Sequence, residues 1–309
     1  MDTTAKYYVA GGGKALCRAL VRALTSAGCT DVAGAGMSEP DYTDKAAVDS
    51  FFASFRPKYV FIAGGKAGGI GHNQTHPGSL SLDNLLLATH VMEAGRVYGV
   101  KKMVYLASSC CYPKVCPQPI AESDLMSGPL EPTNEAYAQA KLAGMALARA
   151  YRQEYGLDYV TAIPTNYFGP GDDFSPENSH VIGALLSRFH AAKVNGDLEV
   201  TIWGTGRPRR EFLYVDDIAT ACLAVMASYS DGAPINIGGG SDLSIADLAI
   251  MVRDVVGYAG SLRFDREKPD GMMQKRLDAA KLLALGWSPT HDFKMALRQT
   301  YDWFCGQAA

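Results

Sequence analysis

The sequence predicts an α/β fold in which a doubly wound parallel sheet is joined to a smaller C-terminal α/β lobe. Apolar strand-like runs alternate with amphipathic helical runs through the first half, which is typical of a parallel sheet covered by helices on both faces. The first strand runs directly into a glycine turn, "VAGGGKALC" at 9–17. After Pro164 the alternation stops, and a second part of the chain is expected to begin there.

In the first half, predicted strands alternate with predicted helices. The chain opens with a strand at 6–10 and a helix at 14–27, and a second strand is expected within "TDVAGAGMSEPDYTD" at 30–44. The remaining strands are predicted at 58–63, 102–107 and 159–163, and the remaining helices at 84–98 and 134–155. Right-handed crossovers between such parallel strands lead to a doubly wound, Rossmann-type sheet.

The second half mixes shorter elements with a long loop rich in Gly, Pro and Asn at 164–180. Helices are predicted at 181–193 and 244–256, strands at 198–203, 234–237 and near 262–264, and a strand or turn leading into a helix at 213–228. We therefore expect a cofactor domain of residues 1–165, to which 212–236 return, and a substrate lobe of 166–211 and 237–309. A ligand would bind between them, beyond the carboxyl ends of the strands.

Composition narrows the class of protein. The 309 residues are 48% hydrophobic and 20% charged, with a formal net charge of −3, so neither disorder nor nucleic-acid binding is expected. We see neither a secretory signal nor an apolar run of about 20 residues, and predict a cytoplasmic protein with no membrane partner. The seven cysteines are irregularly spaced, which favours reduced thiols, and no metal site is predicted.

The strongest chemical signal is a Tyr and a Lys in "NEAYAQAK". Tyr137 and Lys141 lie four residues apart, so they share one face of the predicted helix. A nearby ammonium favours the phenolate, which would lower the tyrosine pKa and make Tyr137 a proton donor or acceptor. Ser108 ends a predicted strand in "YLASSCCYPK", where its hydroxyl could bond a substrate oxygen. Strand-end Ser, Tyr and Lys in this order resemble the triad of short-chain dehydrogenases and reductases.

Longer motifs narrow this resemblance. The segments "SSCCYPK", "LEPTNEAYAQAKLAG", "PTNYFGPGDDFSPENSHVI", "WGTGRPRREFLYVDD" and "KPDG" resemble the GDP-L-fucose synthase family, from about residue 39 to the C-terminus. Members are extended short-chain dehydrogenases/reductases with 3,5-epimerase and 4-reductase activities on GDP-4-keto-6-deoxy-mannose. The resemblance implies that Ser108, Tyr137 and Lys141 serve the reduction. It implies that Cys110 and His180 are the base and acid of the epimerisation, and it leaves Cys111 as a packing residue.

The resemblance also implies binding residues and partners. It assigns NADP(H) to Gly11, Gly13, Lys14, Asp41, Tyr137, Lys141, Pro164, Asn166 and His180. It assigns a GDP-linked 4-keto sugar to Ser109, Asn166, Arg188, Trp203, Arg210 and Lys275. Arginines suit the sugar's diphosphate because they form bidentate contacts with phosphate oxygens. A homodimer is expected through the helices at 84–98 and 134–155.

The glycine turn departs from the family pattern. Where the family has G-x-x-G-x-x-G, this chain has Gly11, Lys14 and Cys17, which loses the glycines for pyrophosphate approach and for helix packing. Lys14 or Arg18 could instead pair with phosphate at the start of the helix. The second strand ends in neither a ribose-binding acid nor an arginine, so NADP and NAD both stay open. We interpret the turn as an altered loop that still binds the cofactor, rather than as a loop that has lost this function.

Four functions remain open at this point. The first is the complete epimerase and reductase of the family. The second is the same chemistry on another GDP-4-keto sugar, such as a deoxyheptose or an antibiotic sugar. The third is an epimerase that has lost reduction, because the altered turn binds cofactor poorly. The last is a non-catalytic nucleotide-sugar-binding subunit.

Overall fold

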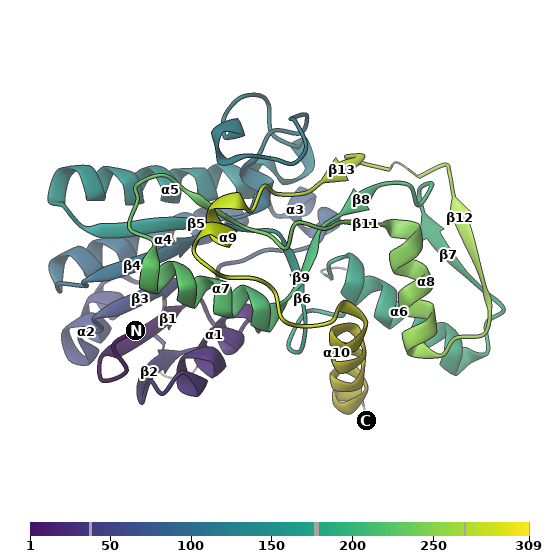
Figure 1. Cartoon of the computed structure of the whole chain (residues 1–309), viewed down its shortest axis with the longest axis horizontal. Helices are drawn as coiled ribbons and strands as arrows, with labels where there is room; N and C mark the ends of the chain where they lie inside the picture. The colour runs from purple at the N-terminus through teal and green to yellow at the C-terminus, as the bar shows by residue number, and fades with distance from the viewer. Residues whose placement is uncertain (37–38, 176–178, 269, 309) are drawn as a thin grey trace.

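A computed structural model describes residues 1–36, 39–175, 179–268 and 270–308 of the chain. Its main sheet has six strands in the order β10-β5-β4-β3-β1-β2, all parallel (Figure 1). The strands are β1 (Lys6–Ala10), β2 (Asp31–Gly34), β3 (Tyr59–Ile62), β4 (Lys102–Leu106), β5 (Asp158–Pro164) and β10 (Ile235–Ile237). The predicted α/β class with a doubly wound sheet is confirmed.

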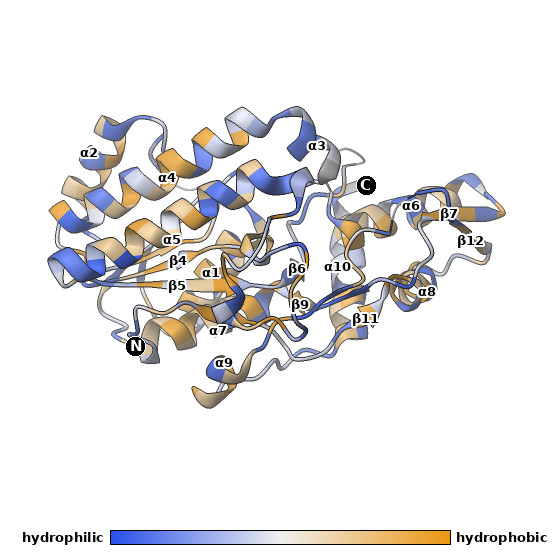
Figure 2. Cartoon of the chain, turned by 90° about the horizontal axis from the view of Figure 1, so that it is seen from above, coloured by the Kyte–Doolittle hydropathy of each residue, from blue (hydrophilic) through white to orange (hydrophobic). Residues whose placement is uncertain are grey.

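Helices cover both faces of this sheet, as Figures 1 and 2 show. On one face lie α1 (Ala15–Ser26) and α7 (Val215–Ser228), and on the other α2 (Lys45–Phe55), α4 (Pro77–Val97) and α5 (Glu135–Tyr155). Strand β1 shows why its sequence is continuously apolar. Tyr7 and Val9 point into the core under α1, while Tyr8 and Ala10 point into the core under α4.

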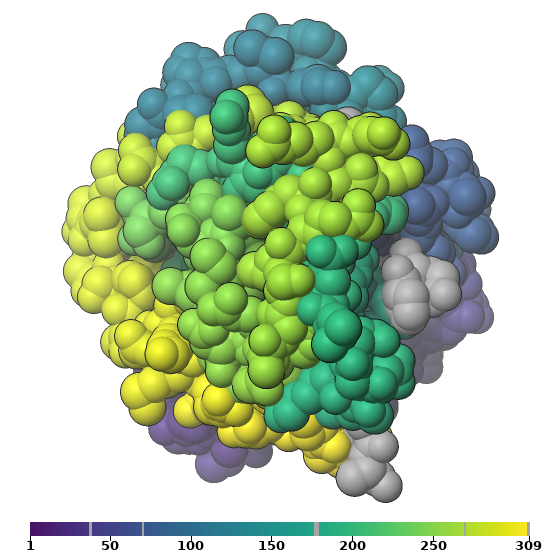
Figure 3. Space-filling view, turned by 90° about the vertical axis from the view of Figure 1, so that its right-hand side faces the viewer, coloured from purple at the N-terminus to yellow at the C-terminus, as the bar shows by residue number. Residues whose placement is uncertain are grey.

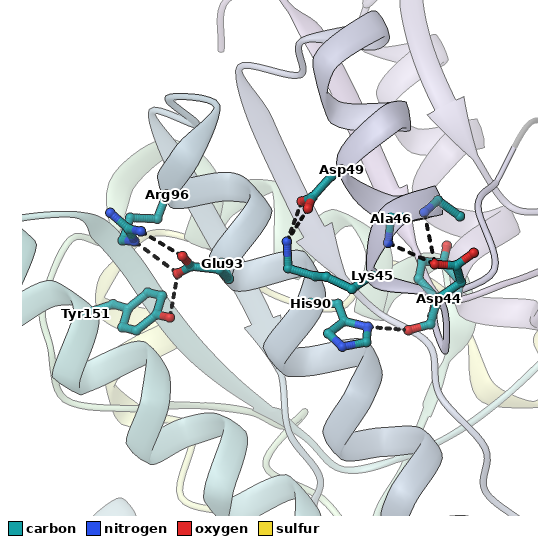
Figure 4. Close-up of polar contacts among 10 residues, drawn as sticks. Asp44, Lys45, Ala46, Asp49, His90, Glu93, Arg96 and Tyr151 are labelled. Carbon is teal, nitrogen blue, oxygen red and sulfur yellow. Dashed lines mark hydrogen bonds and ion pairs between the residues drawn. The ribbon is translucent and has the colours of Figure 1, made fainter.

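Helices α2, α4 and α5 are also tied together by polar contacts (Figure 4). Asp44 caps α2 by accepting the N–H of Ala46 at 2.8 Å. His90 on α4 lies with Nδ1 2.8 Å from the carbonyl oxygen of Tyr42, and thus fixes the segment that leads into α2. The Tyr151 hydroxyl on α5 donates to Glu93 on α4 at 2.7 Å.

A second part of the chain has its own core. Helices α6 (Val181–Asn195), α8 (Ile245–Val256) and α10 (Phe293–Ala308) pack around it, with β7 (Glu199–Trp203) paired to β12 (Ser261–Asp265). Figure 3 looks onto this lobe, whose green surface lies in front of the N-terminal purple segments. Short strands form two further sheets: β6 (Asn166–Phe168) pairs with β9 (Phe212–Tyr214), and β8 (Arg209–Arg210) pairs with β11 (Leu243–Ser244) and β13 (Gln274–Lys275).

A buried carboxylate at the junction orders the segments near the sheet edge. Glu211 is fully buried, and it accepts N–H groups of Gly239 and Gly240 at 2.8 Å and of Leu277 at 2.9 Å. Its own carbonyl oxygen accepts the Asn166 amide at 3.2 Å. Burial raises the pKa of this carboxyl group, and the three N–H donors oppose that shift.

Most predicted elements are confirmed to within one or two residues, and the open segment 213–228 is β9 followed by α7. Helix α4 begins at Pro77 rather than at 84, because Pro77 occupies the first helical turn, where it needs no N–H partner. Among the described residues, the α-helices that were not predicted are α2, α3 (Ile70–Thr75), α9 (Ala280–Ala284) and α10. Among the described residues, no helix is both long and apolar enough to span a membrane.

Candidate active site

A cavity of about 490 Å³ opens at the carboxyl ends of the central strands. It lies where the turn after β1, the end of β4, helix α5 and the loop after β5 meet. Ten of the predicted site residues line it, namely Gly13, Lys14, Ser108, Ser109, Cys110, Tyr137, Lys141, Pro164, Asn166 and His180. The sequence-based placement of the ligand cleft agrees with this position.

Lys141 and Tyr137 face the cavity from one side of α5. The Lys141 ammonium is buried, donates to the carbonyl oxygens of Gly64 (3.3 Å) and Leu106 (3.2 Å), and lies 5.8 Å from the centre of the Tyr137 ring. Burial lowers the pKa of Lys141 to about 8. Burial raises the pKa of Tyr137, so the expected lowering by Lys141 is wrong for this structure. The phenol therefore keeps its proton at neutral pH, which is the form that a proton donor needs.

Two adjacent cysteines at the end of β4 have different surroundings. Ser108 turns the chain there, because its hydroxyl oxygen accepts the N–H of Cys110 at 3.2 Å. Cys110 thereby lines the cavity, while Cys111 is fully buried and contacts the carbonyl oxygen of Ala138. Burial raises the pKa of the Cys111 thiol to about 12, which makes it a packing residue at neutral pH.

Two nitrogen donors converge on the Cys110 sulfur. The Asn134 side-chain amide lies 3.3 Å from Sγ, and the Lys275 ammonium lies 3.9 Å from it. Asn134 directly precedes α5, and Lys275 comes from β13, so the two donors arrive from distant parts of the sequence. The sulfur therefore has a cation and an N–H donor as neighbours on the side that lines the cavity. Asn134 was missed as a site residue, although it lies within the quoted motif "EPTNEAY".

His180 reaches the cavity from the start of α6. Asp172 also lines the cavity, and nothing in the sequence reasoning singled it out. Burial raises the pKa of the Asp172 carboxyl group, and the charges of His180 and Lys14 act in the opposite direction. Part of the predicted loop, residues 176–178, lies outside the described residues.

The glycine turn has a backbone geometry that only glycine permits at its first position. Gly11 has φ of +129°, and a Cβ there would lie 2.1 Å from Gly64 Cα, so no other residue fits. Cys17 is fully buried at the packing position in α1. Gly13, Lys14 and the first residues of α1 line the cavity, which opens the helix N-terminus and a lysine toward it. Both favour an anion such as a dinucleotide pyrophosphate.

Comparison with known proteins agrees with this arrangement. The model of the NAD dependent epimerase/dehydratase family matches residues 7–238. The chain belongs to this family. GDP-L-fucose synthase 1 of Arabidopsis thaliana is 48% identical over 303 residues, covering 98% of this chain and 94% of the relative. The resemblance to GDP-L-fucose synthases that the motifs predicted is thus confirmed.

Two solved structures of the epimerase/dehydratase type share the whole fold. A GDP-L-fucose synthetase from Naegleria fowleri bound to NADP has a TM-score of 0.92 and 30% identity, covering 100% of this chain and 95% of that one. A GDP-6-OMe-4-keto-L-xylo-heptose reductase from C. jejuni has the same TM-score and identity, with 99% of each chain covered. The family thus includes structures with bound NADP.

Not every residue predicted for this family member reaches the main cavity. Arg188 and Trp203 line a separate hollow of about 330 Å³ on the second lobe, where Arg188 donates to the carbonyl oxygen of Thr201 at 2.9 Å. Arg210 lies in β8 directly beside Lys275 of β13. Asp41 is exposed and its carboxylate accepts bonds from Thr43, and Gly11 lies behind the cavity lining.

The buried charge of Lys141 leads to a prediction about the stability of this protein. The folded-state pKa of about 8 lies below the ordinary 10.5, so the cation is disfavoured by folding. The stability linked to this group is present above pH 10.5 and is lost as pH falls through 8. We expect Lys141→Met to raise the free energy of unfolding at pH 7 by roughly 1–3 kcal/mol, because it removes a buried charge.

Urea unfolding at pH 7 and at pH 9 would measure this effect. The gap between variant and wild type should narrow at the higher pH, where Lys141 of the folded wild type is increasingly neutral. A less stable variant at pH 7 would mean that the two carbonyl contacts outweigh the desolvation of the ammonium.

Proposed function

We propose that this protein converts GDP-4-keto-6-deoxy-D-mannose into GDP-L-fucose, by epimerisation at C3 and C5 and reduction at C4 with NADPH. The observation that carries the proposal is that one cavity is lined both by Ser108, Tyr137 and Lys141 and by Cys110 and His180. Reduction needs the first group, and inversion of a carbon needs a base and an acid such as the second. The names of the similar synthases support the substrate.

Epimerisation begins at Cys110 in this proposal. The protons on C3 and C5 are acidic because the C4 ketone stabilises the carbanion as an enolate. The Cys110 thiolate, held by Asn134 and Lys275, removes a proton from one face of the sugar. His180 returns a proton from the other face, which inverts the carbon. Asn134 Oδ1 is buried without a partner among the described residues, and can accept a bond from a sugar hydroxyl.

Reduction uses the residues of α5. When bound, NADPH supplies a hydride to C4. Tyr137 donates its phenolic proton to the C4 oxygen, which is consistent with a phenol whose burial keeps it protonated. The Ser108 hydroxyl donates to the same oxygen and positions the ketone. The Lys141 cation lies beside the Tyr137 ring and stabilises the negative charge that develops when the proton leaves.

The glycine turn and the basic residues of the second lobe hold the two nucleotides. Lys14 and the N-terminus of α1 would bind the cofactor pyrophosphate, and Pro164 and Asn166, which line the same cavity, would hold its nicotinamide. Arg210 and Lys275 are adjacent across β8 and β13, and offer two cations to the sugar-linked diphosphate. Arg188 and Trp203 line the second hollow, and in this proposal they contact the GDP part of the substrate there.

One reaction mixture tests the proposal against its rivals. The protein is incubated with GDP-4-keto-6-deoxy-mannose and NADPH in D2O, and the nucleotide and sugar products are followed by absorbance and mass spectrometry. We expect NADPH oxidation, deuterium at C3 and C5, and GDP-L-fucose. Deuterium without NADPH oxidation would show an epimerase that has lost reduction, and binding without either would show a non-catalytic subunit. Faster turnover of a GDP-4-keto-heptose would replace the substrate but not the chemistry.

We also propose that two copies pair through α4 and α5. Leu82 and Val97 on α4 and Tyr155 on α5 are exposed large side chains on these adjacent helices. Burying them against a second copy would remove apolar surface from water. Sedimentation measures the pairing. The wild-type protein should sediment as a dimer, and Leu82→Lys should shift it toward the monomer.

A further inference from the structure

An acidic side chain folds back onto the glycine turn. The Glu39 carboxylate accepts the N–H of Gly11 and of Gly12, both at 3.2 Å, through one oxygen, and the N–H of Gly36 at 2.7 Å through the other. The Tyr42 hydroxyl donates to the first of these oxygens. A single carboxylate therefore joins the end of β1 to the segment after β2.

This contact decides which groups are left for a cofactor. The N–H groups of Gly12 and Gly36 donate to Glu39, and that of Gly11 is shared between Glu39 and the Tyr42 hydroxyl, so these donors are already occupied. The carboxylate also places a negative charge at the end of β2, where the adenosine ribose lies in doubly wound folds. Tyr42 is itself fixed, because His90 Nδ1 lies 2.8 Å from its carbonyl oxygen. A second phosphate on the ribose would therefore need a cation nearby.

Arg18 is the cation at that place. A Cβ built on Gly13 would lie 3.3 Å from Arg18 Nη2 and 3.7 Å from the carbonyl oxygen of Ala35. The guanidinium thus occupies the space that a side chain at position 13 would fill, between the glycine turn and the end of β2. Arg18 is exposed, and no carboxylate among the described residues forms an ion pair with it, whereas Arg22, one turn further along α1, pairs with Asp216.

We propose that Arg18 binds the 2′-phosphate of NADP(H) and is the residue that selects NADP(H) over NAD(H). The inference rests on the proposed reductase function and assigns the cofactor specificity of that same site. Guanidinium forms bidentate bonds with phosphate oxygens and offsets the charge of Glu39. Arg18 is a specificity residue, since it contacts the end of the cofactor far from the nicotinamide.

Calorimetric titration with NADPH, NADH, 2′,5′-ADP and 5′-AMP tests this assignment. Arg18→Ala should weaken NADPH and 2′,5′-ADP binding by about 10-fold or more, and leave NADH and 5′-AMP unchanged. Lys14→Ala should weaken NADPH and NADH to the same degree, because Lys14 faces the pyrophosphate that both share. Arg22→Ala is the matched control: it removes the same charge from the same helix and should change none of the four.

Three results would overturn the proposal. Arg18→Ala could weaken NADPH and NADH equally, or weaken neither. The wild-type protein could also bind NADH as tightly as NADPH, which would make Glu39 an acceptor for a free ribose hydroxyl. Each of these outcomes leaves NADPH-dependent formation of GDP-L-fucose intact. Failure of the proposed function would look different: the 2′-phosphate preference would follow Arg18, yet no turnover of the sugar would occur.

Discussion

Tyr137→Phe is expected to lower the rate of NADPH oxidation by roughly 10²–10⁴-fold, the usual loss when a general acid is removed. The phenol is the group that the buried α5 site keeps protonated, and phenylalanine retains the ring without the proton. Deuterium exchange at C3 and C5 should continue, because Cys110 and His180 are untouched. The measurement is NADPH oxidation and sugar deuteration in the same D2O reaction.

Tyr151→Phe provides the control for this variant. Tyr151 lies on the same helix, but its hydroxyl bonds Glu93 on α4 and does not line the cavity. It should retain both activities. If Tyr137→Phe oxidised NADPH at the wild-type rate, another group would have to deliver the proton to the C4 oxygen, and the assignment of the triad would be wrong.

Cys110→Ala should reduce deuterium exchange at C3 and C5 by a similar factor, about 10²–10⁴-fold, and formation of GDP-L-fucose with it. The sulfur that Asn134 and Lys275 contact is lost, while Tyr137 and Lys141 remain in place. We therefore expect NADPH to reduce the sugar without inversion, giving an isomer of GDP-L-fucose that lacks deuterium at C3 and C5 and separates from it by chromatography.

Cys111→Ala is the matched control, since it removes the neighbouring thiol from a buried position whose pKa is raised to about 12. It should lose some stability but keep exchange per folded molecule. Equal loss of exchange in both variants would point to disturbance of the strand end. Unchanged exchange in Cys110→Ala would remove Cys110 from the mechanism.

The first half of the fold could be predicted from the sequence because each strand is buried on both faces. Continuous apolar runs such as KYYVA and YVTAI mark these strands, and long amphipathic helices separate them. The two-residue strands β8, β11 and β13 could not be predicted, because they exist only through pairing between distant segments. Helix α2 was missed, although Asp44 has the side chain of a helix cap.

The site could be predicted where its residues follow a strand or share a helical face. Ser108, Tyr137 and Lys141 are of this kind. Asn134 and Glu39 act through contacts that local spacing does not show. No acidic residue ends β2 at Gly34, yet the chain turns back and delivers Glu39 to the glycine turn. The pKa of Tyr137 was misjudged because spacing reveals the neighbouring lysine but not the depth of burial.

Glu211 also bears on how the cleft can move. Its carboxylate bridges residues 239–240 and 277 from within the strand segment that leads into β9, and its carbonyl oxygen holds Asn166 at the cavity wall. A hinge at this junction would have to break several buried bonds at once and leave a charge without partners. Substrate capture is therefore expected to proceed without a rotation of one lobe against the other about this junction.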